Sequence, residues 1–503
     1  MAAAFAKKKS KIVWHKEEDV KLKNLLGENC LPQFEEMEVV DIKREAEKVG
    51  KGDVFFCLTA NRQKAEVACK LANDRGARLC FSNFDVEGCC QLKDVRKVFS
   101  LACKNFYGAA CDKMKMVAVC GTNGKTSTSH IVAQMFKRNG IKVGVVGTSG
   151  VFFDGKEFQS PLTTPDADFL HKTFALMQES GVEIVVMEVS AHAVDQKRVE
   201  GIKFDVAVLT NITQDHLDYF QTMEEYEKTK LSFFKKENVK TAIVCVDDER
   251  AKKLLQVAQV PILTYGIKNP SDAFAIDINC QLGGNKFVAN VCDHVVEVKN
   301  GLVGEYNVYN TLAALSVGFA LGLDERQLAN GINGIRPIEG RFNVMNVAGK
   351  YVVIDYAHSP DGILNVVSAA RKLAKQKVFV VFGCGGNRDK TKRPQMGKIA
   401  SQLADMVCLT DDNPRLEKSM DIIRDIEEGI DCPHFVEPDR EKAIIQMLDY
   451  AKEGDIVIVA GKGAEKYQEV GTEKRPYSDF EAVYKYFQST KSPQAEKRQG
   501  YEC

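Results

Sequence analysis

The sequence predicts an α/β protein with three domains, and three observations support this prediction. A chain of 503 residues is long enough for about three domains. Short apolar runs alternate with amphipathic helical patterns, which is typical of mostly parallel sheets covered by helices. Near 336–340 (RPIEG) the alternation stops and then starts again. We therefore expect a small α/β domain over 1–111, a central domain with a mostly parallel sheet over 112–336, and a C-terminal Rossmann-like domain over 337–503.

Composition and charge argue against several classes of protein. The chain is 45% hydrophobic and 27% charged, as in soluble globular proteins. Its 69 basic and 69 acidic residues give a formal net charge of zero, so we expect no nucleic-acid partner and no membrane partner. No apolar run reaches the roughly 18 residues that a transmembrane helix needs. Sixteen cysteines without an export signal are typical of reduced thiols, so we expect a cytoplasmic protein.

Each domain has its own expected strands. The first domain has an apolar run at 53–58 (DVFFCL), a helical pattern at 64–73 and a strand at 77–81. The strands expected in the central domain lie at 116–120, 184–187, 206–209 and 242–246. Those expected in the last domain lie at 351–354, 378–382, 406–409 and 456–460. Ligands of such sheets bind at the carboxyl ends of the strands, so the turns that follow them are candidate sites.

A glycine-rich turn after the first central strand predicts a phosphate site. Residues 120–128 read CGTNGKTST and lie between a strand and an amphipathic helix. Glycines let backbone N–H groups surround phosphates, and the helix N-terminus adds positive potential. Lys125 can reach the outer phosphates of a nucleotide, and the Thr126 hydroxyl can ligate Mg²⁺. Although Val119 stands where the first glycine of the full pattern would be, we expect a P-loop-type ATPase domain rather than a simple tight turn.

Three further side chains of the central domain have suitable chemistry. Glu188 ends an apolar strand (MEVSAH), where a carboxylate either caps a helix or binds a metal. His216 follows another strand (TNITQDHLDY); a lone histidine is more often structural, but its place at the same sheet edge favours a metal role. Lys230 lies in an otherwise apolar helical stretch (YEKTKLSFF). Unless its stem extends to the surface, such an amine must become neutral, find a partner or be modified.

Nine motifs together resemble those of the Mur ligases, most closely the MurE type. In chain order, over about 116–480, they are GTNGKTS, MEVSAHAVDQKRV, TNITQDHLDY, YEKTK, GEYNVYN, DYAHSPDGI, GCGGNRDKTKRP, DNPR and GKGAEKYQ. The resemblance implies a monomeric amide ligase that uses ATP and Mg²⁺ in peptidoglycan precursor synthesis. Such an enzyme phosphorylates the free carboxylate of UDP-N-acetylmuramoyl-L-Ala-D-Glu, and the amine of a diamino acid then attacks the acyl phosphate.

The resemblance also implies a role for each matching residue. The implied catalytic residues are Lys125, Glu188, His216 and Lys230, with Lys230 carbamylated. The implied metal ligands are Thr126, Glu188, His216 and the carbamate of Lys230. The implied ATP-binding residues are Gly121, Thr122, Asn123, Gly124, Lys125, Thr126, Ser127, Asn307, Asn310, Arg341 and Asp355, with His358 and Lys392 near them. The residues implied to hold the muramoyl dipeptide are Thr163, Thr164, Ser190, Gln196 and Arg198.

The turn at 410–417 (TDDNPRLE) indicates which diamino acid is used. Proline prevents regular structure there, so Arg415 lies on a rigid turn at the carboxyl end of a strand. A guanidinium at this place can clamp a carboxylate, with a local surface ion pair as the alternative. The resemblance implies meso-diaminopimelate, whose additional carboxylate Arg415 would attract, whereas it would repel the distal ammonium of lysine. The full implied amino-acid site is Arg388, Asp412, Asn413, Pro414, Arg415, Gly461 and Glu465, with Glu465 facing the distal ammonium.

The chain departs from the family pattern in three places. The segment 41–44 (DIKR) replaces the Asp-Ser-Arg segment that the family uses near uridine, and TANRQKAEVACK replaces the glycine- and histidine-bearing loop that follows. Ala191 and Ala464 stand where the family has serine and histidine. These departures leave the carrier open, and with it a ligase of the folylpolyglutamate or cyanophycin type, or one that uses lysine or another amino acid. A nucleotide-binding scaffold without activity is the third alternative.

Overall fold

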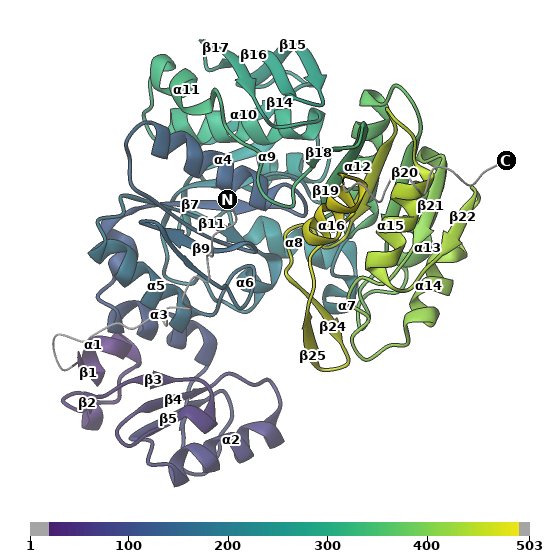
Figure 1. Ribbon diagram of the computed structural model, residues 1–503. Coiled ribbons are helices and arrows are strands. Elements are labelled where there is room, and N and C mark those ends of the chain that lie inside the picture. Colours follow the sequence, from purple (N-terminus) through teal and green to yellow (C-terminus); the bar gives the residue numbers. More distant parts are fainter. Residues whose placement is uncertain (1–19, 492–503) are drawn as a thin grey trace.

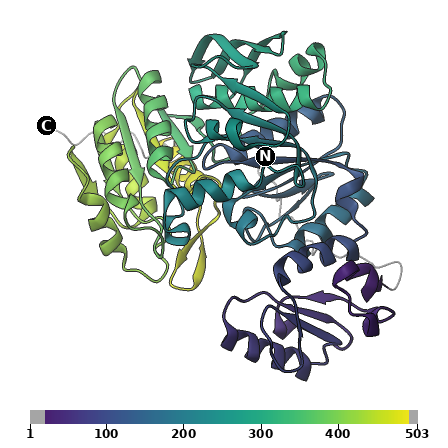
Figure 2. The ribbon, with the colours of Figure 1, turned by 180° about the vertical axis from the view of Figure 1, so that it is seen from behind.

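The computed structural model describes residues 20–491, so the outer ends of the first and third predicted domains lie outside the described residues. Figure 1 shows three α/β units in chain order, and Figure 2 shows them from behind. The central unit contacts both of the others, which lie on different sides of it. The predicted α/β class is confirmed by these sheets and helices.

The first unit is a four-stranded parallel sheet in the order β3-β4-β5-β6. Its strands are β3 (Ile42–Lys43), β4 (Val54–Cys57), β5 (Leu79–Ser82) and β6 (Cys90–Gln91). Helices α2 (Arg62–Asp74) and α3 (Val95–Phe106) pack against opposite faces, because Phe55 and Phe56 point into two different cores. Three short elements precede this sheet in the chain: the paired strands β1 (Val20–Lys21) and β2 (Glu38–Val39), and the helix α1 (Leu22–Leu26).

The central unit is built on an eleven-stranded sheet with the order β10-β9-β8-β11-β7-β12-β13-β14-β15-β16-β17. The strands from β8 to β15 in this order pair in parallel, which confirms the mostly parallel sheet. They are β7 (Lys115–Cys120), β8 (Val143–Gly147), β11 (Ile184–Val189), β12 (Phe204–Leu209), β13 (Val239–Cys245), β14 (Ile262–Gly266) and β15 (Ala273–Gln281).

Helices cover both faces of this sheet because successive side chains point to opposite sides. Val117 and Val119 face a core with α4 (Lys125–Arg138), α10 (Glu305–Ala320) and α11 (Glu325–Ile332). Met116 and Ala118 face a second core with α5 (Ala167–Glu179). Four shorter helices also belong to the central unit: α6 (Ala191–Asp195), α7 (Leu217–Phe220), α8 (Met223–Ser232) and α9 (Leu254–Val257).

Antiparallel strands extend the central sheet at both ends, and the sequence analysis missed them. They are β9 (Gly150–Phe153), β10 (Lys156–Phe158), β16 (Gly284–Val291) and β17 (His294–Asn300). Strands β16 and β17 alternate buried residues with more exposed ones, so they lack the continuous apolar runs of the predicted parallel strands, and β9 and β10 have only four and three residues. The parallel strands β8, β14 and β15 were not predicted either. The turn between β16 and β17 has positive φ at Cys292 (47°) and Asp293 (69°), as two-residue hairpin turns do.

The third unit is a six-stranded sheet with the order β18-β19-β23-β20-β21-β22. Its strands are β18 (Asn343–Val347), β19 (Lys350–Asp355), β20 (Val378–Phe382), β21 (Met406–Leu409), β22 (His434–Val436) and β23 (Ile456–Ala460). Only β18 pairs antiparallel. One face packs against α12 (Pro360–Leu373), α13 (Lys392–Leu403) and α14 (Ser419–Glu427), and the other against α15 (Arg440–Tyr450) and α16 (Asp479–Lys491). This doubly wound sheet confirms the Rossmann-like prediction.

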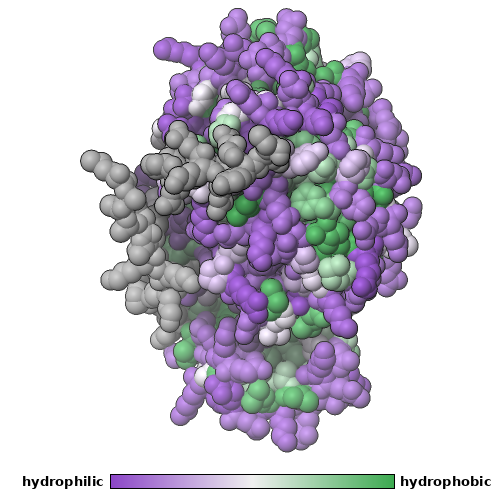
Figure 3. Space-filling view, turned by 45° about the vertical axis from the view of Figure 1, so that its right-hand side comes forward, coloured by the Kyte–Doolittle hydropathy of each residue, from purple (hydrophilic) through white to green (hydrophobic). Residues whose placement is uncertain are grey.

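A hairpin of β24 (Tyr467–Val470) and β25 (Glu473–Pro476) lies beside the third sheet and was also not predicted. Its residue Val470 forms a parallel bridge to Arg415. The face in Figure 3 is mostly hydrophilic, with apolar side chains in small groups. Over residues 20–491, none of the helices is long and apolar enough to cross a membrane.

Candidate active site

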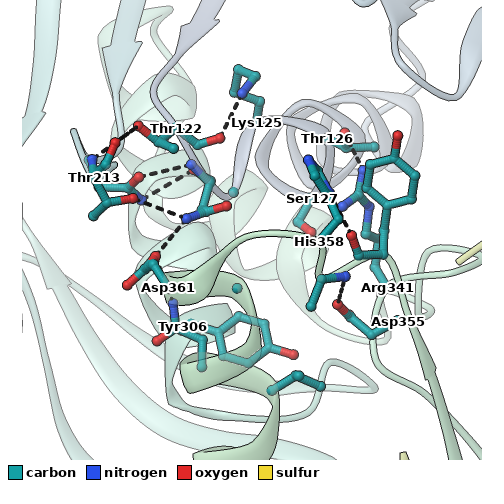
Figure 4. A pocket seen from close by; sticks show the side chains of 18 of the residues that line it. Thr122, Lys125, Thr126, Ser127, Thr213, Tyr306, Arg341, Asp355, His358 and Asp361 are labelled. Carbon is teal, nitrogen blue, oxygen red and sulfur yellow. Dashed lines mark hydrogen bonds between the residues drawn. The ribbon is translucent and has the colours of Figure 1, made fainter. Parts of the chain in front are cut away.

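A cavity of about 950 Å³ lies where the carboxyl edge of the central sheet faces the third unit. Both units contribute side chains to it, and Figure 4 shows Thr126 and Ser127 of the phosphate loop near Arg341, Asp355 and His358. Most of the predicted site residues line this cavity. The predicted residues that are not part of its lining are Gly121, Thr164, Ser190, Gln196, Arg198, Asn307, Lys230 and Pro414.

The phosphate loop has the tight backbone that its glycines predict. It joins β7 to α4, and Gly121 and Gly124 have φ of 142° and 83°. A Cβ on Gly121 would lie 1.8 Å from Thr210 Oγ1, and one on Gly124 would lie 2.7 Å from Asn310 Oδ1. Larger residues at either position would therefore displace a neighbouring strand end or α10, in addition to the cost of a positive φ.

Two lysines converge on one carbonyl of this loop. Lys125 Nζ donates to the carbonyls of Gly121 (2.9 Å) and Thr122 (2.8 Å), and Lys230 Nζ donates to the same Gly121 carbonyl (2.8 Å). Lys230 is 3% exposed and makes no ion pair among the described residues. Burial, together with the charge of Lys125, lowers the pKa of Lys230 to about 7. Its amine is therefore substantially neutral at physiological pH, and the surface alternative for this lysine is wrong.

Glu188 ends β11 and is directly connected to the phosphate loop. Its Oε1 accepts from Thr126 Oγ1 (3.0 Å) and from the Thr148 backbone N–H (2.9 Å). Its Oε2 accepts from Thr148 Oγ1 (3.1 Å), which also contacts Thr163 Oγ1 (2.9 Å). Glu188 therefore caps no helix, and it places a buried carboxylate beside the hydroxyl that could ligate Mg²⁺.

His216 follows β12 and has an unusual backbone conformation. Its φ is 56°, and its Nε2 lies 3.5 Å from a carboxylate oxygen of Asp215. Burial lowers the pKa of His216 well below its ordinary value. The nearby charges of Lys125 and Lys230 lower this pKa further, whereas the charge of Asp215 raises it. A neutral imidazole is the form that can ligate a metal or accept a proton.

The residues predicted for the muramoyl dipeptide form a connected group that leads away from the cavity. Thr164 Oγ1 donates to the Glu188 carbonyl (2.9 Å), and Ser190 caps α6. Arg198 donates to the Thr164 carbonyl (2.8 Å) and to Gln196 Oε1 (2.7 Å). Their side chains point into this network, so Thr163 is the member that reaches the cavity wall.

Side chains of the third unit contact the phosphate loop directly. Arg341 Nη2 donates to Thr126 Oγ1 (2.9 Å), and its guanidinium stacks 4.5 Å from the centre of the Tyr356 ring. The side-chain amide of Asn123 donates to Asp361 at the start of α12 (Figure 4). Burial raises the pKa of Asp355, whose carboxylate accepts from the backbone N–H of the residue after Arg341 (2.7 Å). The loop is thus bound between two units.

The far end of the cavity contains residues that the sequence analysis missed. Asp247, after β13, accepts from Tyr309 Oη (2.9 Å) and from three backbone N–H groups at 267–269. Tyr306 lies nearer the third unit, with its ring centre 6.1 Å from that of Phe342, and its hydroxyl has no partner within residues 20–491. Asn310 lines the cavity, whereas Asn307 lies beneath it and donates to the Val303 carbonyl (2.8 Å). The acidic pair at 247–248, which follows a strand, was the sequence signal that could have indicated this end of the cavity.

The predicted amino-acid pocket forms the third-unit end of the cavity. Asn413 donates to Glu465 Oε2 (3.2 Å), and Arg388 and Arg415 line the wall. Gly461 has φ of 115°, and a Cβ there would lie 2.4 Å from Asp412 Oδ2. That oxygen is buried and has no partner in the described part of the chain, so the pocket holds an unsatisfied acceptor.

Lys462 was missed, and it is the main partner of Glu465. Its amine is fully buried and donates to Glu465 Oε2 and Asn413 Oδ1, each at 2.9 Å. The prediction that Glu465 faces a distal ammonium therefore requires Glu465 to share its carboxylate with Lys462. The signal was the lysine within GKGAEKYQ itself.

A buried arginine holds the two pocket loops together. Arg393, at the start of α13, is fully buried and donates to both oxygens of Glu417 (3.0 Å each) and to Asp425 (2.8 Å). Glu417 also accepts from the backbone N–H of Asn387, next to Arg388. The arginine hydrogen bonds lower the pKa of Glu417 to about 2.

We expect this carboxylate to make stability depend on pH. Because the folded pKa lies below the unfolded value of about 4.3, Glu417 contributes at most about 3 kcal/mol above that pH. The contribution is lost as pH falls from about 4.5 towards 2. Urea unfolding of wild type and Glu417→Gln should therefore differ most near pH 7 and converge in acid, whereas the exposed Glu428→Gln should match wild type throughout. A difference independent of pH would contradict the role of ionisation.

Comparisons with known proteins bear on this site. Residues 119–318 match the Mur ligase middle domain, and 340–463 match the Mur ligase glutamate ligase domain. The UDP-N-acetylmuramoyl-L-alanyl-D-glutamate--2,6-diaminopimelate ligase of Bacillus licheniformis is 36% identical over 461 residues, which cover 89% of this chain and 94% of the relative. The chain belongs to the Mur ligase family. The same-named ligase of Geobacillus thermodenitrificans is 37% identical to this Mur ligase and covers 88% of it and 93% of the relative.

Solved structures agree with this assignment. A ligase of that same name has a TM-score of 0.69 and 29% identity, covering 94% of this Mur ligase and 100% of the solved chain. A folylpolyglutamate synthase of Mycobacterium tuberculosis has a TM-score of 0.61 at 18% identity and shares the fold alone, covering 72% of this Mur ligase and 91% of the solved chain. The relatives align over more of the chain than the nine motifs did, so the likeness includes part of the first unit.

Proposed function

We propose that this Mur ligase uses ATP to join meso-diaminopimelate to the D-Glu carboxylate of UDP-N-acetylmuramoyl-L-Ala-D-Glu, in the cytoplasm and as a monomer. Residues 1–111 hold the carrier, 112–336 the nucleotide, and 337–503 the amino acid. The observation that carries the proposal is the shared cavity, in which the phosphate loop and the pocket of Arg388 and Arg415 open to one space. The relatives named as diaminopimelate ligases support it.

The arrangement suits a reaction in which a carboxylate is first phosphorylated. Lys125 and Arg341 place positive charge at the phosphate loop, where charge develops on the transferred phosphoryl group. The acyl phosphate is then close enough to the third unit to meet an amine held beside Asn413 and Glu465. Positioning the two reactants in one cavity removes most of the entropic barrier of this attack.

The residues present fit Mg²⁺. Thr126 and Glu188 offer hard oxygen ligands 3.0 Å apart, and Mg²⁺ in nucleotide sites is held by one or two such groups together with phosphates. No group of three acidic, histidine or cysteine side chains converges within 20–491, so a site made of protein ligands alone is not formed by the unmodified residues. A carbamate on Lys230 would add a carboxylate near His216. When bound, Mg²⁺ neutralises phosphate charge during transfer.

Phosphate release tests the proposal. ATP and UDP-N-acetylmuramoyl-L-Ala-D-Glu are mixed with meso-diaminopimelate, L-lysine or L-ornithine, using wild type and Arg415→Ala. We expect release with diaminopimelate only, and a fall in kcat/KM of about a hundredfold in the variant, because the distal carboxylate loses a partner that is largely shielded from water. The exposed Arg424→Ala is the matched control and should behave as wild type. Release with lysine instead would assign another amino acid, and no release with any would assign another carrier.

A further inference from the structure

Arg415 is not a free guanidinium in this structure. Its Nε donates to Glu469 Oε2 at 2.8 Å, and its Nη1 donates to the Gly386 carbonyl at 2.9 Å. The side chains of Arg415 and Glu469 are both 25% exposed, so the pair is largely shielded from water. From the sequence we predicted a guanidinium that clamps a substrate carboxylate, with a local ion pair as the alternative, and the structure contains such a pair. Here one of its two edges is already occupied by a carboxylate of the same chain.

Hydrogen bonds fix the main chain around this ion pair. The Arg415 backbone N–H donates to the Glu469 carbonyl (3.1 Å), and the Gly471 N–H donates to the Arg415 carbonyl (2.8 Å). The Glu469 N–H in turn donates to Asn413 Oδ1 (2.9 Å). The β24–β25 hairpin is therefore joined to the Asn-Pro-Arg turn on both sides of the ion pair. Only the side chain of Glu469 can leave the guanidinium without breaking this bridge.

A second cation is available to receive that side chain. Lys474 lies opposite Glu469 in the hairpin register, and its Nζ is 3.6 Å from Glu469 Oε1. Cross-strand pairs of opposite charge at this position interact favourably. A rotation of the Glu469 side chain towards Lys474 would free the Arg415 edge and leave no carboxylate without a partner.

We infer that Glu469 is a specificity-determining residue, which competes with the distal carboxylate of the diamino acid for Arg415. This inference rests on the proposed function. A substrate carboxylate must displace Glu469, so affinity for diaminopimelate is lower than an unpaired arginine would give. With Glu469 in place, the pair is neutral overall, and it therefore repels the distal ammonium of lysine less than a free guanidinium would. Glu469 thus reduces the discrimination between the two amino acids.

The test is Glu469→Gln, which keeps the shape and the backbone bridge and removes the charge. We expect KM for meso-diaminopimelate to fall about fivefold, the size of one partly exposed ion pair, with kcat unchanged. The Ki of L-lysine, measured as a competitor of diaminopimelate, should rise in the same variant, and the KM for ATP should stay the same. Opposite changes for the two amino acids would separate this role from a structural one. Glu473→Gln, on the neighbouring strand and exposed, is the matched control and should resemble wild type.

Several outcomes would overturn the inference. An unchanged or higher KM for diaminopimelate in Glu469→Gln, at an unchanged Tm, would show that Glu469 does not compete. A parallel loss with both amino acids would show that the pair only supports the fold. Titration calorimetry of meso-diaminopimelate, with ATP bound and no carrier present, gives the same comparison without turnover. If turnover fails while the variant binds diaminopimelate more tightly, the proposed carrier is wrong and the inference stands; if neither protein binds it, the inference falls.

Discussion

Replacing Lys230 with alanine should lower ligase turnover by at least about a thousandfold, the scale of losing a main electrostatic group of a phosphoryl-transfer site. The structure supports this through three facts: the amine is buried, it has no acidic partner within residues 20–491, and its pKa is about 7. A neutral amine can add to dissolved CO₂, forming an N–C bond and releasing a proton, and the product is a carbamate. Lys125 repels the protonated form of Lys230, whereas Lys125 and Mg²⁺ would attract the carbamate anion.

Rescue distinguishes the carbamate from the lysine itself. Lys230→Glu, or short carboxylic acids added to Lys230→Ala, should restore part of the turnover because either supplies a carboxylate. ¹³C-labelled bicarbonate should give one carbamate resonance in wild type that is absent from Lys230→Ala. The exposed Lys228→Ala lies on the same helix and should retain both activity and signal. Full activity in Lys230→Ala would remove the residue from the mechanism.

The largest effect on stability is expected from Arg440→Met in the third unit. Arg440 is buried and donates to both oxygens of Asp479 (2.8 and 2.9 Å), and also to the Ala460 carbonyl (2.8 Å). The variant leaves a fully buried carboxylate without its cation, which costs about 3–5 kcal/mol. Since Ala460 precedes Gly461, the same change should also weaken binding of the amino acid.

Calorimetric unfolding would measure this effect as a lower Tm. Arg440→Met with Asp479→Leu should regain much of the loss, because removing both charges avoids the unpaired one. The matched control is Lys485→Met, since Lys485 and Glu441 join the same two helices at the surface and contribute about 1 kcal/mol or less. Equal losses for the buried and the surface pair would contradict the burial argument.

Sequence patterns located the phosphate loop and Glu188 because both lie close to strand ends. A buried strand, a glycine turn and a helix start are local features, so the phosphate loop and Glu188 could be located without a structure. Contacts between distant segments could not be located in this way. Arg341 meets Thr126, and Asn123 meets Asp361, across more than 200 positions of chain. Their pairing depends on how two sheets face each other, which no local pattern records.

The amino-acid pocket shows the same limit more sharply. Arg415 and Gly461 were placed correctly at the pocket wall, because each follows a strand. The partner of Arg415 was missed, because Glu469 belongs to a short hairpin that is half-buried in β24 and exposed in β25, and so has no continuous apolar run. Asn307 differs from these residues: its amide donates to the Val303 carbonyl, so it lies beneath the cavity and not on its wall.

The joint between the first and central units includes several polar contacts. Its contacts include the pairing of Arg44 with Asp168 (3.2 Å) and side-chain hydrogen bonds from Ser100 and Lys104 to backbone carbonyls. Within the described chain, no residue before Thr122 lines the cavity. If residues 1–111 hold the carrier, as proposed, substitutions there can change which acceptor is bound and leave the lining of the cavity unaltered. Acceptor choice and bond formation would then be separable properties of one chain.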